Sequence, residues 1–185
     1  MSEATRKGAE ERMKKTVEAM QGDLLSVRTG RATPALLEGV RVDYYGSPVP
    51  LKQIASISAP EPRLLVVQPY DKGALGEIEK AIQKADLGFN PSNDGQIIRI
   101  PIPPLTEERR QDLVKKVKRA AEEFKVSVRN IRREANDELR AKEKDKRISE
   151  DESRRGQTEI QKLTDVYTRK IDELFDVKER EILEN

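Results

Sequence analysis

The sequence predicts an α+β fold in which a small β/α/β domain, residues 31–104, is inserted into an elongated three-helix bundle, residues 1–30 and 105–185. Three long segments carry apolar residues at spacings of three and four, the periodicity of one buried helix face. All ten prolines fall between Gly30 and Pro104, so this segment differs from the rest. Charged residues make up 38% of the chain, which is typical of long helices that each bury one narrow stripe.

The first helix has an apolar face that begins at Ala9, and it is expected to stop near Thr29. Gly30 stands where a C-terminal cap is expected, and Pro34 prevents the helix from continuing. Its apolar face consists of Ala9, Met13, Val17, Met20, Leu24 and Val27.

The inserted segment contains short apolar runs separated by prolines and glycines, a pattern that indicates strands. One part differs, because Asp71–Leu87 has apolar residues at helical spacing, begins with a capping Asp and ends before Gly88. The expected strands are Val40–Gly46, Leu51–Ser58, Arg63–Tyr70 and Gln96–Ile102.

The second and third helices follow the insert. Thr106 can cap the second helix, and no Gly or Pro interrupts that helix before Ser149. Ser149 and Glu152 form a capping box for the third helix, which Gly156 weakens by about 1 kcal/mol relative to Ala. The two apolar stripes are Leu113, Val117, Ala121, Phe124, Val128, Ile131, Ala135 and Leu139, and then Ile160, Leu163, Tyr167, Ile171 and Leu174.

The three stripes can cover one another within one chain, so we expect a monomer. Two chain segments join the bundle to the inserted domain, and both contain residues that break regular structure, which favours a hinge. The expected hinge residues are Thr29, Gly30, Arg31, Pro103, Pro104 and Leu105.

The composition argues against an enzyme. The chain has no cysteine and no histidine, which removes thiolate chemistry, the commonest general base and the commonest metal ligand. No phosphate-binding glycine loop occurs, so we expect no cofactor and no metal. No apolar segment approaches the length of a membrane span, and a chain without cysteine fits a cytoplasmic protein.

One group of charges is asymmetric. At about 100° per residue, most cationic side chains of the second helix fall on a strip beside its apolar stripe. Arginine forks suit phosphate oxygens, and a row of them over several turns could follow a nucleic-acid backbone. This cationic strip consists of Lys115, Lys118, Lys125, Arg129, Arg132, Arg133, Asn136 and Arg140, and Arg28 and Arg31 near the end of the first helix could extend it.

Charge geometry alone leaves two interpretations of the cationic strip open. In the first, the strip binds nucleic acid. In the second, it is an ordinary solvated face whose arginines pair with Glu122, Glu134 or Glu138.

Several stretches of the sequence carry a resemblance to a known family. They are VRTGRATPALL (Val27–Leu37), VDYYGSPVPLKQIASI (Val42–Ile57), KADLGFNPSNDG (Lys84–Gly95), PPLTEERR (Pro103–Arg110), VSVRNIRRE (Val126–Glu134) and EIQKLTDVY (Glu159–Tyr167). None of them is a chemical motif, but their joint order and spacing are specific. Through them the chain resembles bacterial ribosome recycling factors over its whole length, with slight departures at Phe124 and Gly156 that concern local packing.

The resemblance implies an L-shaped molecule similar in outline to transfer RNA. It also implies binding to large-subunit ribosomal RNA at the subunit interface of the post-termination ribosome. Elongation factor G and GTP would then separate the subunits, with the GTP bound by that partner. By position, Arg132 matches the family's arginine most closely tied to ribosome binding, with Arg129 and Arg133 beside it and Arg31 near the same surface.

Two other classes of protein compete with this interpretation. A helical adaptor or chaperone would use the apolar stripes for partner helices and would expose a large apolar area. An enzyme is the third class, and the missing histidine, cysteine and phosphate loops weigh against it. Salt-sensitive binding to ribosomes would separate the first class from both others.

Overall fold

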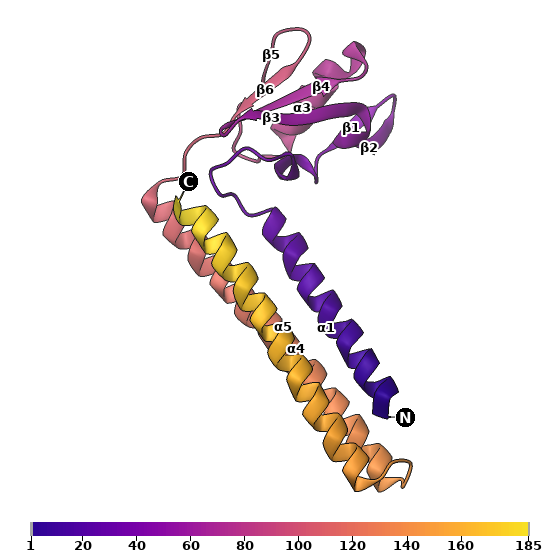
Figure 1. Cartoon of the computed structure of the whole chain (residues 1–185). Coiled ribbons are helices and arrows are strands. Elements are labelled where there is room, and N and C mark those ends of the chain that lie inside the picture. The colour runs from indigo at the N-terminus through magenta and orange to yellow at the C-terminus, as the bar shows by residue number, and fades with distance from the viewer. Residues whose placement is uncertain (1, 185) are drawn as a thin grey trace. The chain divides into compact units, whose positions relative to one another are not determined.

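The computed structural model describes residues 2–184, which form long helices and two small sheets (Figure 1). The chain divides into two compact units. One contains the chain up to Leu24 together with Gln111–Glu181, and the other contains Leu25–Arg110 together with the chain from Ile182 onward. The first unit is helical and the second contains the sheets, so the expected α+β class is confirmed. The expected domain boundaries, at residues 30/31 and 104/105, stay a prediction.

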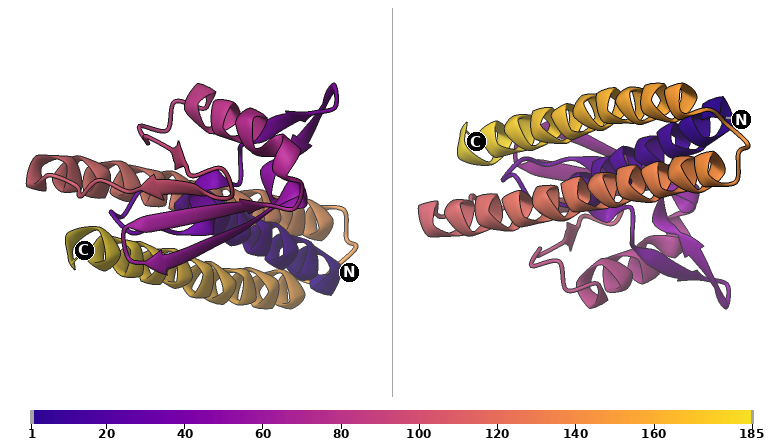
Figure 2. Two further views of the ribbon diagram at one scale, coloured as in Figure 1. Left: turned by 90° about the horizontal axis from the view of Figure 1, so that it is seen from above. Right: turned by 90° about the horizontal axis from the view of Figure 1, so that it is seen from below.

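The first unit contains most of three helices, α1 (Ser2–Leu25), α4 (Glu107–Lys144) and α5 (Glu150–Glu184), which run side by side (Figures 1 and 2). The apolar stripes expected from the sequence face one another. In α4 every stripe residue is buried except Phe124, which is half-buried. In α5, Ile160, Tyr167 and Ile171 are buried, whereas Leu163 and Leu174 are half-buried. The periodicity of the sequence therefore identified most of the core of the bundle.

Side-chain caps begin the two long helices as expected. Thr106 Oγ1 accepts a hydrogen bond from Arg109 N at 3.2 Å at the start of α4. At the start of α5, Ser149 Oγ accepts from Glu152 N at 3.2 Å, while Ser149 N donates to Glu152 Oε2 at 2.9 Å. Both predicted caps are confirmed, because a cap depends only on residues within one turn of each other.

The predicted end of the first helix is wrong. Helix α1 ends at Leu25 rather than near Thr29. Gly30 does adopt the left-handed conformation expected of a cap, with φ +80°, but it does so in the following loop. That loop is held by the sheet unit, since Thr29 is buried and Ala32 N donates to Pro62 O at 2.7 Å.

Gly156 has a packing role that the sequence did not reveal. A Cβ atom at this position would lie 2.8 Å from Leu139 Cδ1 and 3.3 Å from Leu139 Cδ2. Leu139 is fully buried. The missing side chain therefore lets α5 approach α4 more closely than an alanine would allow.

The second unit contains two antiparallel sheets. Strands β1 (Arg41–Tyr44) and β2 (Ser47–Pro50) form a hairpin. The larger sheet has the strand order β3-β4-β6-β5, and its strands are β3 (Ala55–Glu61), β4 (Leu64–Pro69), β5 (Ser92–Asn93) and β6 (Ile98–Pro101). Short helical segments complete the unit: η1 (Pro34–Leu37), α2 (Leu51–Ile54), η2 (Lys72–Ala74) and α3 (Leu75–Lys84).

Apolar residues from these elements form one core. The side chains of this core with no exposed surface come from both sheets and from α3: Val42, Leu65, Val67, Ile78, Ile98 and Ile100. The helix predicted over Asp71–Leu87 is present as η2 and α3, and Asp71 Oδ1 accepts from Gly73 N at 2.9 Å as a cap. The helix stops three residues earlier than expected, because Asp86 already has a positive φ of 48°.

Two of the predicted strands differ from the structure. Leu51–Ile54 is a single helical turn, and the strand begins only at Ala55. Leu51 and Ile54 are both buried, and their spacing of three places both on one side of a helical turn but on opposite faces of a strand.

Val40–Gly46 was predicted as one strand, but the strand ends at Tyr44. Tyr45 and Gly46 have φ values of 50° and 83° and form a two-residue hairpin turn. Strand β2 contains Pro48 and Pro50, so the sequence did not indicate a strand there. The strand tolerates these prolines because it pairs only with β1.

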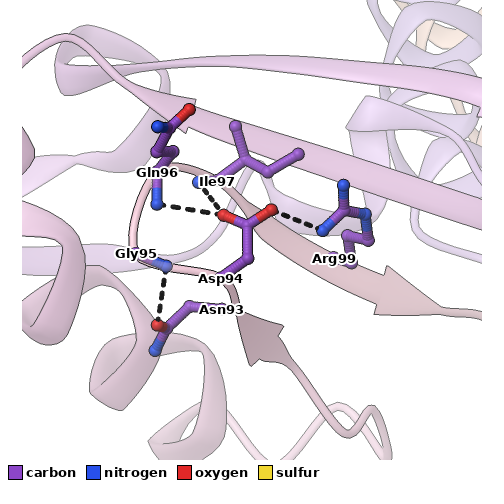
Figure 3. Close-up of polar contacts among 6 residues, drawn as sticks. All are labelled: Asn93, Asp94, Gly95, Gln96, Ile97 and Arg99. Carbon is purple, nitrogen blue, oxygen red and sulfur yellow. Dashed lines mark hydrogen bonds and ion pairs between the residues drawn. The ribbon is translucent and has the colours of Figure 1, made fainter.

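A polar turn joins β5 to β6 (Figure 3). The Asp94 carboxylate accepts hydrogen bonds from Gln96 N and Ile97 N, both at 3.0 Å, and from Arg99 Nη1 at 2.7 Å. These three donors, with the Ile97 N–H as the largest contributor, lower the pKa of Asp94 from 3.8 to about 2. The ionised carboxylate therefore closes the turn.

Candidate nucleic-acid interface

The main cationic residues of the strip lie along the uninterrupted helix α4. Arg129 and Arg133 are exposed, while Lys125, Arg132 and Asn136 are half-buried at the edge of the apolar stripe. This placement agrees with the helical angles, which put the strip beside the buried face. The row extends over several turns of one rigid element.

The three glutamates that could have paired with the arginines of the strip contact other residues. Glu122 pairs with Lys125 at 2.6 Å, and Glu134 pairs with Arg12 of α1 at 2.6 Å. Glu138 Oε1 accepts from Lys142 at 2.6 Å and from Thr5 at 2.7 Å, and the Lys142 contact is the largest cause of its lowered pKa. Within residues 2–184, no carboxylate lies within 4.0 Å of the guanidinium groups of Arg129, Arg132 and Arg133. These three arginines keep their full charge.

Around Arg129, the sequence of α4 offers no acidic residue at the spacings that face each other on a helix. Residues three or four positions away from Arg129 are Lys125, Val126, Arg132 and Arg133. Like charges at this spacing destabilise a helix by roughly 0.2–0.5 kcal/mol per pair. Lys125 is paired with carboxylates, but Arg129 has none within 4.0 Å among the described residues to offset this cost.

The two remaining arginines of this triplet contact only neutral partners. Arg132 Nη1 donates to Gln161 Oε1 of α5 at 3.1 Å. Arg133 Nη2 donates to Asn130 Oδ1 at 2.5 Å. Amide oxygens orient a guanidinium without removing its charge, so donors remain for phosphate oxygens.

Lys125 differs from its neighbours in the strip. Its ammonium group pairs with Glu122 and with Asp172 of α5, the latter at 2.9 Å. The hydrogen bonds to Glu122 and Asp172 raise the pKa of Lys125. With two carboxylate partners, Lys125 joins α4 to α5 and contributes little free charge.

The outer members of the strip are less constrained. Lys115 and Lys118 are exposed, and Arg140 is 3.6 Å from Asp137. The side-chain oxygen of the half-buried Asn136 is buried and has no hydrogen-bond partner within the described part of the chain. The unpartnered oxygen of Asn136 therefore adds one polar group to the edge of α4 that carries Arg132 and Arg129.

Arg28 and Arg31 belong to the sheet unit. The Arg28 guanidinium lies 5.0 Å from the centroid of the Phe89 ring, and its buried Nε has no hydrogen-bond partner among residues 2–184. Arg31 is exposed. Their contribution to the cationic strip stays a prediction.

The predicted hinge residues also belong to the sheet unit. Thr29 and Gly30 are buried, and a Cβ atom on Gly30 would lie 3.7 Å from Leu105 Cγ. On the other connection, Ile102 N donates to Arg63 O at 2.8 Å just before Pro103 and Pro104. A hinge at these residues stays a prediction.

One polar cluster was not anticipated. Tyr44 ends β1, and Tyr45 occupies the hairpin turn and is 84% exposed. The hydroxyl groups of Tyr44 and Tyr45 both donate to Asp71 Oδ2, at 3.3 and 3.1 Å. The sequence alone does not predict this contact, because Asp71 lies 26 positions beyond Tyr45.

The described residues offer neither a cluster of metal ligands nor a helix able to span a membrane. Residues 2–184 contain no group of three or more histidine, cysteine, aspartate or glutamate side chains arranged to hold a metal ion. No helix in the same range has both the length and the apolar character needed to cross a bilayer.

Similar proteins were found at the level of sequence and of structure. A family model described as ribosome recycling factor matches residues 20–183. The ribosome-recycling factor of Natranaerobius thermophilus is 61% identical over 176 residues, which cover 95% of this chain and 96% of the relative. That of Bacillus licheniformis is 59% identical over 184 residues, which cover 100% of both chains.

Two solved structures are also similar to this chain. A solution structure of a ribosome recycling factor has a TM-score of 0.81 at 45% identity and covers 100% of this chain and 98% of its own. A second structure contains the T. thermophilus ribosome recycling factor and the E. coli elongation factor G bound to the E. coli post-termination complex. Its recycling factor has a TM-score of 0.68 at 51% identity and covers 99% of both chains. Because the family model and these relatives span nearly the whole sequence, the chain belongs to the ribosome recycling factor family.

Proposed function

We propose that this protein recycles ribosomes after translation termination. It binds the post-termination ribosome at the subunit interface through large-subunit ribosomal RNA, and it promotes subunit dissociation together with elongation factor G. The factor, and not this chain, binds the GTP. The protein acts as a monomer in the cytoplasm, and its role is binding rather than catalysis. Membership of the family supports this proposal, as does the relative bound with elongation factor G to a post-termination complex.

The observation that carries the proposal is the row of unneutralised arginines on α4. Arg129, Arg132 and Arg133 contact no carboxylate within the described range, although glutamates are near in sequence. Each phosphate contact releases counterions, so the logarithm of affinity should fall with the logarithm of salt concentration by about 0.7–0.9 per contact. Three such contacts give a slope of about 2 to 3 from this row alone.

Co-sedimentation with bacterial ribosomes across a series of salt concentrations tests the proposal. Arg132→Ala should weaken binding by roughly tenfold or more and should reduce the salt slope by about one contact. Arg119→Ala is the matched control, because Arg119 is an exposed arginine of α4 on the face opposite the apolar stripe. It should leave both quantities close to those of the wild type.

Thermal unfolding separates binding from folding. Arg132 has no ion pair among residues 2–184, so Arg132→Ala should melt near the wild-type temperature. Ile131→Ala removes a buried side chain, 6% exposed, and should cost about 2–5 kcal/mol. Equal loss of ribosome binding in the Arg119 control, or a melting loss at Arg132 as large as at Ile131, would contradict the proposed role of the row.

Subunit dissociation is proposed to use a hinge between the bundle and the inserted domain, at Thr29–Arg31 and Pro103–Leu105. Gly30 supplies a left-handed backbone on one connection, and consecutive prolines stiffen the other. An engineered disulfide between the domains should leave ribosome binding intact and stop factor-driven dissociation until reductant is added. The chain has no cysteine of its own to interfere. Full dissociation by the oxidised protein would show that interdomain motion is not required.

A further inference from the structure

Gln161 of α5 contacts Arg132, the half-buried arginine of the triplet Arg129, Arg132 and Arg133. Its Oε1 accepts a hydrogen bond from Arg132 Nη1 at 3.1 Å, and its Nε2 donates to Asp165 Oδ1 at 2.9 Å. Both ends of the amide are therefore occupied. Because the Asp165 carboxylate can only accept, it fixes the amide with the oxygen towards Arg132.

Arg132 contacts a neutral side chain of α5, whereas Lys125 contacts a charged one. Lys125 lies seven residues before Arg132, which places both on the same face of α4 towards α5. There α5 offers the Asp172 carboxylate, and the charge of Lys125 is neutralised. At Arg132 the same helix offers an amide, which differs from a glutamate side chain by one terminal group. The α4–α5 contact can thus accommodate a carboxylate, but Arg132 faces a neutral acceptor.

We propose that Gln161 is a positioning residue that holds the Arg132 guanidinium in place without neutralising it. The hydrogen bond restricts one end of a side chain with large rotamer freedom, so less entropy is lost when the guanidinium meets phosphate. The remaining N–H donors stay available to the ligand. The inference rests on the proposed function, because it assigns to Gln161 a role in binding the RNA that Arg132 contacts.

Gln161→Glu tests the importance of the neutral acceptor with almost no change in size. The carboxylate cannot donate to Asp165 as the amide does and is repelled by it, so it should form an ion pair with Arg132 and compete with phosphate for this arginine. We expect affinity for bacterial ribosomes to fall roughly tenfold and the salt slope to fall by about one contact. The matched control is Gln21→Glu, the same chemical change on the exposed face of α1, which should alter affinity by no more than about twofold.

Gln161→Met tests orientation separately from charge. This variant removes the acceptor but keeps the charge of Arg132, so affinity should fall by a few fold while the salt slope stays at the wild-type value. In the Arg132→Ala background, neither change at Gln161 should reduce affinity further, because the side chain it positions is absent. Thermal unfolding should be unchanged in every Gln161 variant to within a few degrees.

Several outcomes would overturn the inference while leaving the proposed function intact. If Arg132→Ala weakens binding but Gln161→Glu binds as the wild type does, the neutral acceptor is unimportant. If Gln161→Glu weakens binding equally with Arg132 present or absent, its effect does not pass through Arg132. A large drop in melting temperature would make Gln161 a structural residue. If instead the wild-type protein does not bind ribosomes, or Arg132→Ala has no effect, the proposed function itself fails.

Discussion

Replacing Gly156 with alanine should destabilise the bundle, although the same change stabilises most helices. Alanine is favoured over glycine inside a helix by about 1 kcal/mol. At Gly156, however, the new methyl group would lie 2.8 Å from Leu139 Cδ1 and 3.3 Å from Cδ2, both too close for ordinary contact. Leu139 is completely buried, so its side chain can move only if its neighbours move as well.

The expected change in the free energy of unfolding is the balance of two opposing effects. Inserting a methyl group into a well-packed core costs about 1–3 kcal/mol, against a gain of about 1 kcal/mol from helix propensity. The expected net loss is about 1 kcal/mol in the free energy of unfolding. Gly8→Ala is the matched control in α1, because a Cβ at Gly8 would meet no atom within 4 Å. That change should stabilise the protein by about 0.5–1 kcal/mol.

The Leu139→Ala variant tests whether the effect of Gly156→Ala comes from the contact with Leu139. Leu139→Ala alone should cost about 2–5 kcal/mol, because it leaves a cavity in the core. In that background the clashing atoms are absent, so adding Gly156→Ala should stabilise the protein and partly fill the cavity. Urea unfolding of the four variants, followed by helical circular dichroism, measures each free energy. The reasoning is refuted if Gly156→Ala stabilises the wild-type background as much as Gly8→Ala does.

Three further changes test individual contacts. Asp94 has its pKa lowered from 3.8 to about 2. Its contribution to stability should therefore be complete above pH 4 and disappear as the pH falls through about 2, and Asp94→Asn should remove this acid dependence from the unfolding curve. Ser149→Ala removes the acceptor of the Glu152 N–H in the capping box and should cost about 1 kcal/mol in urea unfolding. Gly30→Ala should cost about 1–2 kcal/mol because of its left-handed φ of +80°, with no steric clash to relieve, and the same measurement checks it.

The helices of the bundle could be predicted because their signals are local. Thr106 and Ser149 cap helices within one turn of themselves, and each apolar stripe repeats within its own helix. The end of α1 could not be predicted in this way. Its stop at Leu25 reflects a loop held by the sheet unit, through the hydrogen bond from Ala32 to Pro62 thirty positions later.

The sheet unit shows a second limit of local reasoning. Leu51 and Ile54 read as strand residues by composition, but the unit buries both on one side through a single helical turn. Strand β2 escaped prediction because its prolines are tolerated only on an edge, and edge position is a property of the whole sheet. Tyr45 likewise finds its hydrogen-bond partner in Asp71 only after the chain has folded.

For the candidate site, helical angles correctly placed Lys125 and Arg132 beside the apolar stripe, but they could not say what each residue would meet. The register of α5 along α4 determines which side chain each of these residues contacts. Lys125, Arg132 and Leu139 are seven residues apart, so they form one row along α4, and they contact Asp172, Gln161 and Gly156 of α5 in turn. If the close approach at Gly156 helps to set this register, it also determines that Arg132 meets the amide of Gln161. A change that moves α5 away from Leu139 should therefore disturb Arg132 as well, although the two positions lie about 10 Å apart along the helix by its rise per residue. If Gly156→Ala weakens ribosome binding and Gly8→Ala does not, the packing contact and the charged surface are coupled through the α4–α5 register.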